Sequence, residues 1–530
     1  MLQTPRSTRG MVTASHHLAA QSGLDVLREG GNAIEAMIAA AATISVVYPH
    51  MNGLGGDGFW LISEPNRRPP RAINAVGAAG AAVDEALYRR RGFSKVPERG
   101  PLAANTVGGT ISGWQKALVI SDEWGGRFSL ERLLEDAIYY ARAGMPVTES
   151  QYRMTTEKRD ELVDVPGWAD VFLVDGHAPP PGTLFKQPAL AETLQRLAAE
   201  GLDDFYRGGL ARKIAADLEH AGSPITGEDL ARQSAVETEP LSVKLRTGTL
   251  YNVMPPSQGL ASLLILGIFD RLDCEEAEGV DYVHGVVEST KQAILIRNEH
   301  VTDPAYMKVD PRDFLTESAL TELADKIDKK KAMPWPVQAV PGDTVWLGAI
   351  DVEGRAVSFI HSIYWEFGSG VVLRDTGIKW QNRGSSFSLN ENEQNYVRPG
   401  RLPFHTNNPA MALLYDGRVM LYGTMGGEGQ PQTQAAIFTR YAMFGQELQQ
   451  AITAPRWVLS RTWGSPRADL RIEGRFDREV IDALRDAGHE ITVLEPLTHV
   501  MGHAGAIVLH PSGLMEGATD PRSDGAVAAF

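Results

Sequence analysis

The chain has 530 residues, of which 43% are hydrophobic and 22% charged, and these proportions are typical of a globular protein. Its formal net charge is −15, and no long block of Lys or Arg interrupts the acidic balance, which argues against nucleic acid as a partner. The longest apolar stretch, residues 36–47, is shorter than the roughly 20 residues that a membrane-spanning helix needs, so we expect no membrane partner. The single cysteine, Cys274, excludes an intramolecular disulfide, and no apolar segment opens the chain; we therefore expect a cytoplasmic protein.

The first predicted elements are two helices that precede a glycine-rich turn. Residues 18–29 show helical spacing and end at a glycine pair, and Asn32 with Glu35 three positions later is typical of a capping box. Residues 33–47 are apolar nearly all round, which predicts a buried helix. Residues 53–58 match G-x-G-x-x-G, but a helix precedes them and a strand-like run follows. This order is the reverse of a dinucleotide site, so we interpret the glycines as a tight turn.

Further along the chain, the periodicity changes from helical to strand-like. Residues 127–143, 187–195 and 260–272 have helical spacing, whereas prolines break residues 320–343 into a loop after a charged, solvated helix end. Residues 344–350 and 356–364 are rich in β-branched and aromatic side chains, and the five residues between them predict a hairpin turn. Thr344 thus lies where a loop enters the first strand of a hairpin.

The sequence contains none of the common motifs for a metal site or a serine nucleophile. Thirteen histidines form no H-E-x-x-H, and the helical spacing of His499 and His503 is interrupted by Gly502, so we expect no metal and no cofactor. No G-x-S-x-G is present to form a nucleophile elbow. Residue types and spacing alone therefore indicate an α/β protein with a threonine at a loop–strand junction.

Eight short blocks nevertheless resemble the γ-glutamyltransferase family along almost the whole chain. Each block is weak evidence alone, whereas eight in the family's order are specific. They are GMVTAS (10–15), GGNA (30–33), GLGGDGF (53–59), VGGT (107–110), MPP (254–256), FGSGV (367–371), APR (454–456) and ATDPRS (518–523).

The resemblance implies an α/β fold of the N-terminal-nucleophile hydrolase type, an αββα sandwich of two stacked, mainly antiparallel sheets between helical layers. It also implies a proenzyme that cleaves itself before Thr344, into a large chain of residues 1–343 and a small chain of residues 344–530 that stay together as one intertwined domain. A homodimer is compatible with this organisation. Family members need no metal or cofactor, and their partner is a small-molecule substrate.

The family's catalytic residues map onto four positions of this sequence. Thr344 corresponds to the nucleophile, and its own α-amine, with a pKa near about 7.7–8.0 once it is N-terminal, can accept the hydroxyl proton. Ser362 matches a threonine that hydrogen-bonds the nucleophile, and a serine keeps the hydroxyl. Gly426 and Gly427 match the glycine pair whose backbone amides stabilise the oxyanion.

The substrate pocket departs from the family in a consistent direction. Typical members hold the α-amine of a γ-glutamyl group with Asn, Gln or Glu, and Asp side chains, where this sequence has Tyr364, Arg383 and Ser386; the family's paired serines appear as His405 and Thr406. The changes remove the groups that hold an ammonium and add a guanidinium suited to a carboxylate. We therefore expect a small amide with a carboxylate near the carbonyl, bound by Tyr364, Arg383, His405 and Thr406. Within the family this pattern resembles enzymes of purine and allantoin breakdown that convert oxamate to oxalate and ammonia.

Three alternatives remain open at this point. The first is a γ-glutamyl hydrolase or transferase that acts on glutathione-like compounds, and the second is an amidase similar to cephalosporin acylases. The third, of another class, is an uncleaved homologue that only binds ligands. The combined presence of Thr344, Ser362, Gly426 and Gly427 favours an enzyme over the binding protein.

Overall fold

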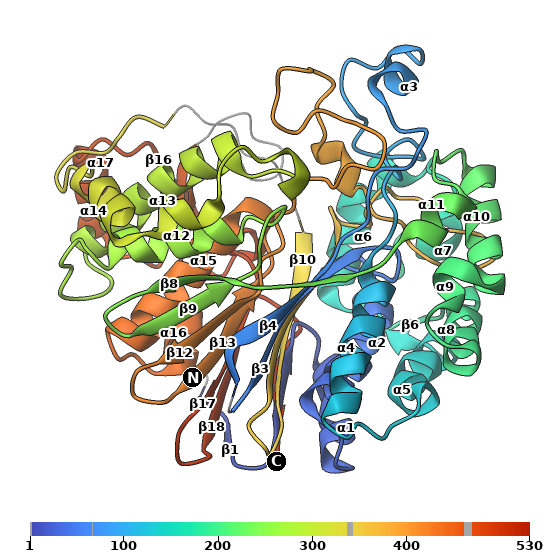
Figure 1. Cartoon of the computed structure of the whole chain (residues 1–530), viewed down its shortest axis with the longest axis horizontal. Helices are drawn as coiled ribbons and strands as arrows, with labels where there is room; N and C mark the ends of the chain where they lie inside the picture. The colour runs from blue at the N-terminus through green and yellow to red at the C-terminus, as the bar shows by residue number, and fades with distance from the viewer. Residues whose placement is uncertain (1–2, 66, 336–342, 460–468) are drawn as a thin grey trace.

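The computed structural model describes residues 3–65, 67–335, 343–459 and 469–530. Within these ranges two seven-stranded antiparallel sheets stand face to face in the middle of the molecule (Figure 1). The first sheet runs in the order β1 (Arg6–Ser7), β18 (Met515–Thr519), β17 (Ala504–Leu509), β13 (Val419–Thr424), β12 (Ala410–Leu414), β9 (Gly248–Asn252), β8 (Leu241–Lys244). The second runs in the order β19 (Ala526–Ala529), β2 (Met11–Ala14), β10 (Asp343–Ile350), β11 (Ala356–Tyr364), β3 (Asp57–Glu64), β4 (Arg67–Ala75), β7 (Val236–Thr238).

Helices cover the outer faces of both sheets, which confirms the αββα fold expected from the sequence (Figure 1). On the side of the second sheet lie α1 (His17–Arg28), α2 (Ala33–Val47), α4 (Thr110–Glu123), α5 (Leu130–Ala143), α6 (Glu149–Leu162), α7 (Trp168–Phe172), α8 (Pro188–Glu200), α9 (Asp204–Arg207), α10 (Gly209–Ala221) and α11 (Gly227–Arg232). The short helix α3 (Glu85–Arg89) lies apart from them, at the top of the view. Beside the first sheet lie α12 (Gly259–Phe269), α13 (Val280–His300), α14 (Glu317–Asp325), α15 (Gln430–Phe438), α16 (Leu448–Thr453) and α17 (Arg478–Asp486).

Shorter elements complete the described chain. Two strands, β5 (Met145–Pro146) and β6 (Leu184–Phe185), pair with each other, and a small sheet contains β14 (Trp457–Leu459), β15 (Leu470–Glu473) and β16 (Ile491–Leu494). The single-turn helices are η1 (Pro304–Tyr306), η2 (Pro311–Leu315), η3 (Arg383–Ser386), η4 (Gly427–Gly429), η5 (Thr439–Met443) and η6 (His499–Met501). Among the described residues, no helix combines the length and the apolar character needed to cross a membrane.

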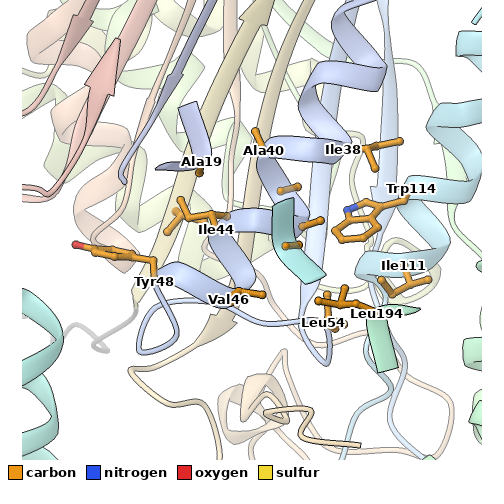
Figure 2. Packing of buried hydrophobic residues seen from close by; sticks show 14 of the residues in the cluster. Ala19, Ile38, Ala40, Ile44, Val46, Tyr48, Leu54, Ile111, Trp114 and Leu194 are labelled. Atoms are coloured by element: carbon orange, nitrogen blue, oxygen red, sulfur yellow. The ribbon is translucent and has the colours of Figure 1, made fainter. Parts of the chain in front are cut away.

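The helix α2 is the centre of the larger hydrophobic core. All of its residues are buried, and the capping box expected at its start is formed: the Asn32 side chain accepts from the Glu35 amide, and Glu35 accepts from the Asn32 amide. Figure 2 shows Ile38, Ile44 and Val46 among side chains from neighbouring helices, with Trp114 on one side. A helix without a polar face is stable only when covered on all sides, so α2 fixes α1, α4 and α5 around it.

The expected hairpin forms β10 and β11 in the second sheet. Backbone hydrogen bonds across residues 351–355 close its turn, and β10 lies between β11 and β2. The pairing shifts register near the start of β10, because Asp343 faces Tyr364 whereas Val345 faces His361. An extra residue on one strand re-aims nearby side chains. The register shift therefore decides how Thr344 and Ser362 face each other.

Most helical predictions are confirmed, with small changes at the ends. Residues 33–47 and the two hairpin strands match closely, whereas the helix expected from residue 127 begins at Leu130, after the Ser129 cap. The charged stretch after residue 325 follows the end of α14, and the proline-rich residues 336–342 lie outside the described residues. The spacing of His499 and His503 forms only the single turn η6, because Gly502 ends it with a positive φ of 81°.

Candidate active site

Thr344 lies at the start of β10, where the side chains of four elements meet. The residue is fully buried, and its Oγ1 atom lies 3.2 Å from Ser362 Oγ on β11. Oγ1 also lies 3.2 Å from Asn407 Oδ1, in the loop before β12, and accepts from Gln430 Nε2, at the start of α15, at 3.3 Å. Because these groups come from separate elements, the hydroxyl orientation is fixed by the tertiary fold.

A second set of bonds orients the partners of Thr344. Ser362 Oγ accepts from the Tyr364 amide at 2.8 Å, so the serine is held at the register shift. The Asn407 carbonyl oxygen accepts from Thr344 and from Arg383 Nη2, the latter at 3.5 Å. This orientation turns the Asn407 Nδ2 group away from both, and among the described residues this buried donor has no partner. It is therefore available to an oxygen atom of a bound substrate.

Gly426 and Gly427 form the turn that leads from β13 to α15. Both have positive φ values, 117° and 53°, which are the left-handed conformations that glycine adopts without strain. The Gly427 carbonyl accepts from Gln258 Nε2 at 2.8 Å, and Gln258 is held in turn by Arg297. The first amides of a helical segment have no acceptor within the helix, and the helix dipole makes its start positive. The turn precedes Gln430, whose side chain contacts Thr344, so the predicted oxyanion role of the two amides stays a prediction.

Arg383 begins the η3 turn and lies fully buried against Tyr364. The guanidinium carbon is 3.8 Å from the centre of the Tyr364 ring, and Nη1 donates to Thr406 Oγ1 at 3.1 Å. Its hydrogen-bond partners, Thr406 and Asn407, carry no charge, and within the described ranges no carboxylate forms an ion pair with it. Burial lowers the pKa of Arg383 to about 10, so the group remains a cation at neutral pH. Burial likewise raises the pKa of Tyr364 to about 12, which keeps the phenol neutral.

His405 pairs with an aspartate that we did not predict. His405 Nε2 lies 3.0 Å from Asp57 Oδ2, and both side chains are fully buried. Burial, followed by the repulsion of Arg383, holds the pKa of His405 well below its usual range. Burial raises the pKa of Asp57 to about 7, although Arg383 opposes this rise. Ser386, the third changed position, is only half-buried, and its Oγ donates to the Phe404 carbonyl at 3.4 Å.

The structure thus brings the eight predicted residues together with three that sequence reasoning missed. Asn407 and Gln430 contact Thr344 directly, and Asp57 holds His405. Each missed residue lies in a segment already singled out: Asp57 in the glycine-rich turn, Asn407 next to Thr406, and Gln430 shortly after the glycine pair. Buried polar residues in such segments were the available signal, but only the fold shows which of them converge.

Known proteins similar to this chain match it over nearly its whole length. The profile of the gamma-glutamyltranspeptidase family matches residues 19–530. An oxamate amidohydrolase proenzyme of Klebsiella pneumoniae is 56% identical over 99% of both chains, and the glutathione hydrolase-like YwrD proenzyme of Bacillus subtilis is 42% identical over 99% of both. The crystal structure of a cephalosporin acylase from Bacillus halodurans superposes with a TM-score of 0.91 at 33% identity, covering 100% of this chain and 97% of that one. The chain therefore belongs to the gamma-glutamyltranspeptidase family, as an N-terminal-nucleophile amidohydrolase.

Proposed function

We propose that the protein cleaves itself between Asp343 and Thr344 and then hydrolyses a small amide whose carbonyl bears a neighbouring carboxylate, with oxamate as the substrate and oxalate and ammonia as the products. Thr344 is the proposed nucleophile, Ser362 its hydrogen-bonding partner, and the amides of Gly426 and Gly427 the oxyanion donors. The 56% identity to an oxamate amidohydrolase proenzyme over the full chain supports this substrate.

The observation that carries the proposal is a buried guanidinium next to the nucleophile, which forms no direct ion pair with a carboxylate of the described residues. The Arg383 guanidinium and Thr344 Oγ1 both contact Asn407 Oδ1, so a group bound to Arg383 lies close to the reacting hydroxyl. The Nε atom of Arg383 is buried and has no hydrogen-bond partner among the described residues. A buried charge is costly unless it is paired. A substrate carboxylate would supply this charge and accept two parallel hydrogen bonds from the planar guanidinium.

The proposed reaction follows from these positions. After self-cleavage, the α-amine of Thr344 accepts the hydroxyl proton while Oγ1 attacks the amide carbon. The oxyanion that forms is stabilised by the amides of Gly426 and Gly427, and the C–N bond then breaks to release ammonia with the transferred proton. Water next attacks the ester carbon on Thr344, and the ester C–O bond breaks to release oxalate and restore the hydroxyl. Tyr364 stands where typical members have a smaller side chain, so we expect a shortened pocket that favours a short substrate over a γ-glutamyl group.

Two further parts of the proposal rest on the family resemblance and the strand order. The two cleaved chains are proposed to stay associated, because strands that precede and follow the proposed cleavage site pair in both sheets: β10 pairs with β2, β11 pairs with β3, and β12 pairs with β9. The proposed setting in purine and allantoin breakdown rests on the resemblance, and the proposed cytoplasmic location rests on the single cysteine and the polar N-terminal segment.

A substrate panel tests the proposal directly. Purified protein is incubated with oxamate, oxamide, a γ-glutamyl anilide and a glutaryl amide, and release of ammonia or amine is measured. We expect self-cleaved protein on a denaturing gel and oxamate as the preferred substrate by kcat/KM. Preference for the γ-glutamyl or glutaryl compound would replace the oxamate assignment, and an intact chain without any turnover would favour the binding protein.

A further inference from the structure

Asp57 is a fully buried carboxylate that the proposed reaction does not use. It begins β3, and its Oδ1 atom accepts the amides of Gly77 at 3.0 Å and Gly109 at 2.9 Å. Its Oδ2 atom lies 3.0 Å from Nε2 of His405. These three contacts fix the carboxylate on both oxygens. Asp57 therefore influences Arg383 only through space, as a fixed negative charge, and forms no ion pair with it.

His405 connects this carboxylate to the pocket wall. Its backbone is held on both sides, because its amide donates to the Pro256 carbonyl and its carbonyl accepts from the Gln258 amide. Its ring packs edge-on against Phe59, with 4.9 Å between ring centres, and its Nδ1 atom is buried without a partner among the described residues. The next residue, Thr406, accepts from Arg383. The Asp57–His405 pair and Arg383 thus belong to one buried site.

The charged and titratable groups that face Asp57 are His405, Arg383 and Tyr206. Burial raises the pKa of Tyr206 far above its usual range, with a contribution from Asp57, so this phenol stays neutral. Arg383 stays charged at neutral pH, and His405 alone is a weak base in this environment. Among these groups, only the Asp57–His405 pair can therefore change its charge near neutrality, where the pKa of Asp57 lies at about 7.

We propose that the Asp57–His405 pair balances the charge of Arg383 in the empty pocket and takes up one proton when the substrate carboxylate binds to Arg383. In the empty site, one carboxylate and one guanidinium sum to zero. A bound substrate adds a second carboxylate, and an uncompensated buried charge is unfavourable. Protonation of the pair restores neutrality without moving any residue. This inference rests on the proposed function, and it makes Asp57 a positioning residue that acts through Arg383.

The expected pH dependence has a definite sign. Below about pH 7 the pair already carries its proton, so the empty site is positive and binds a carboxylate without further change. Above that pH, binding must draw a proton from solution, so the KM for oxamate should rise by up to about tenfold per pH unit. The KM for oxamide, which has no carboxylate, should stay flat over the same range. The rise of kcat with pH, set by the α-amine of Thr344, is a separate effect.

The test is calorimetric titration of the mature wild-type enzyme with pyruvate, a monoanion that carries one carboxylate beside a carbonyl as oxamate does, in buffers with different ionisation heats. We expect uptake of about one proton per site at pH 8 and little at pH 6. Asp57→Asn should abolish the uptake and make the KM for oxamate independent of pH, because an amide side chain does not take up a proton in this range. The asparagine keeps the oxygen that accepts from Gly77 and Gly109, so the local structure should be retained. The matched control is Asp351→Asn, since Asp351 is an equally buried carboxylate that binds Arg355 away from the site; this variant should behave like wild type.

The outcomes separate this inference from the proposed function. Wild type that turns over oxamate but takes up no proton at pH 8 would overturn the inference and leave the function standing. An Asp57→Asn enzyme whose KM keeps the wild-type pH slope would overturn it as well. If Asp57→Asn fails to fold or to cleave, the wild-type calorimetry and the comparison of oxamate with oxamide decide alone. No turnover of oxamate at any pH would refute the proposed function itself.

Discussion

Replacing Arg383 by glutamine examines the central contact of the proposed substrate site. Glutamine is polar and of similar length, and it can keep one of the two hydrogen bonds, to Thr406 or Asn407. It cannot supply the positive charge or the paired donors that a carboxylate accepts. Hydrogen bonds to charged groups contribute about 1.5–3 kcal/mol. Because 1.36 kcal/mol corresponds to a factor of ten, kcat/KM for oxamate should fall by about 10–200-fold.

The assay compares oxamate with oxamide, because the two differ only in the carboxylate. Arg383→Gln should slow oxamate hydrolysis and leave the oxamide rate nearly unchanged, while self-cleavage still occurs, since the scissile peptide has no substrate carboxylate. Arg383→Lys should recover only part of the loss, because an ammonium offers charge without a planar pair of donors. Equal slowing of both substrates would refute the reasoning and make Arg383 a structural residue.

Arg440→Gln provides the matched control. Arg440 is also fully buried and also lies over an aromatic ring, that of Tyr282, but it forms an ion pair with Glu278. Its replacement should lower the stability of the protein without changing the ratio of oxamate to oxamide turnover. A change in that ratio would mean that loss of a buried arginine alters the pocket indirectly, and the Arg383 result could then not be assigned to the carboxylate.

Three further changes test other parts of the structure. Thr344→Ala should remain a single 57.7 kDa chain by mass spectrometry, whereas wild type should give two fragments; an intact, active wild type would contradict self-cleavage. Asn407→Ala removes an acceptor of the Thr344 hydroxyl and should lower kcat by about 10²-fold with a smaller change in KM, as misplacement of a reacting group does; unchanged kcat would exclude this role. Lys291→Met leaves the carboxylate of Glu288, bound at 2.6 Å and 2% exposed, without its cation, and should cost about 3–5 kcal/mol in denaturant unfolding, part of which Glu288→Gln should recover. A Lys291→Met variant as stable as wild type would contradict the expected role of this buried ion pair.

The cluster around Lys291 also links the two segments of the proenzyme. His284, on α13, lies 2.9 Å from His489, which follows α17, and Lys291 donates to the Met333 carbonyl at 2.6 Å. His284 and Met333 precede the proposed cleavage site, and His489 follows it. Because Glu288 lies 3.9 Å from His489, loss of Glu288 should weaken a contact that holds the two proposed chains together after cleavage.

The local sequence by itself determined the elements whose signals lie within a few residues. The capping box at Asn32 and the continuous apolar run fixed the bounds of α2, because both are properties of neighbouring positions. The hairpin could be predicted from the sequence for the same reason, since the residue pattern of its two strands and the turn between them lie within one segment. Together with the resemblance of ordered blocks, these signals were enough to select Thr344, Ser362 and the glycine pair.

Only the tertiary structure decided how the site is assembled. Asp57 and His405 are separated by 348 positions in the sequence, and Thr344 and Gln430 by 86, so no local pattern reports either contact. The burial of Arg383, and the uncharged partners that it has within the described part of the chain, are likewise properties of packing. They arise because strands and turns from distant parts of the chain meet at the start of β10, and the chemistry of each side chain is set by what the fold places beside it.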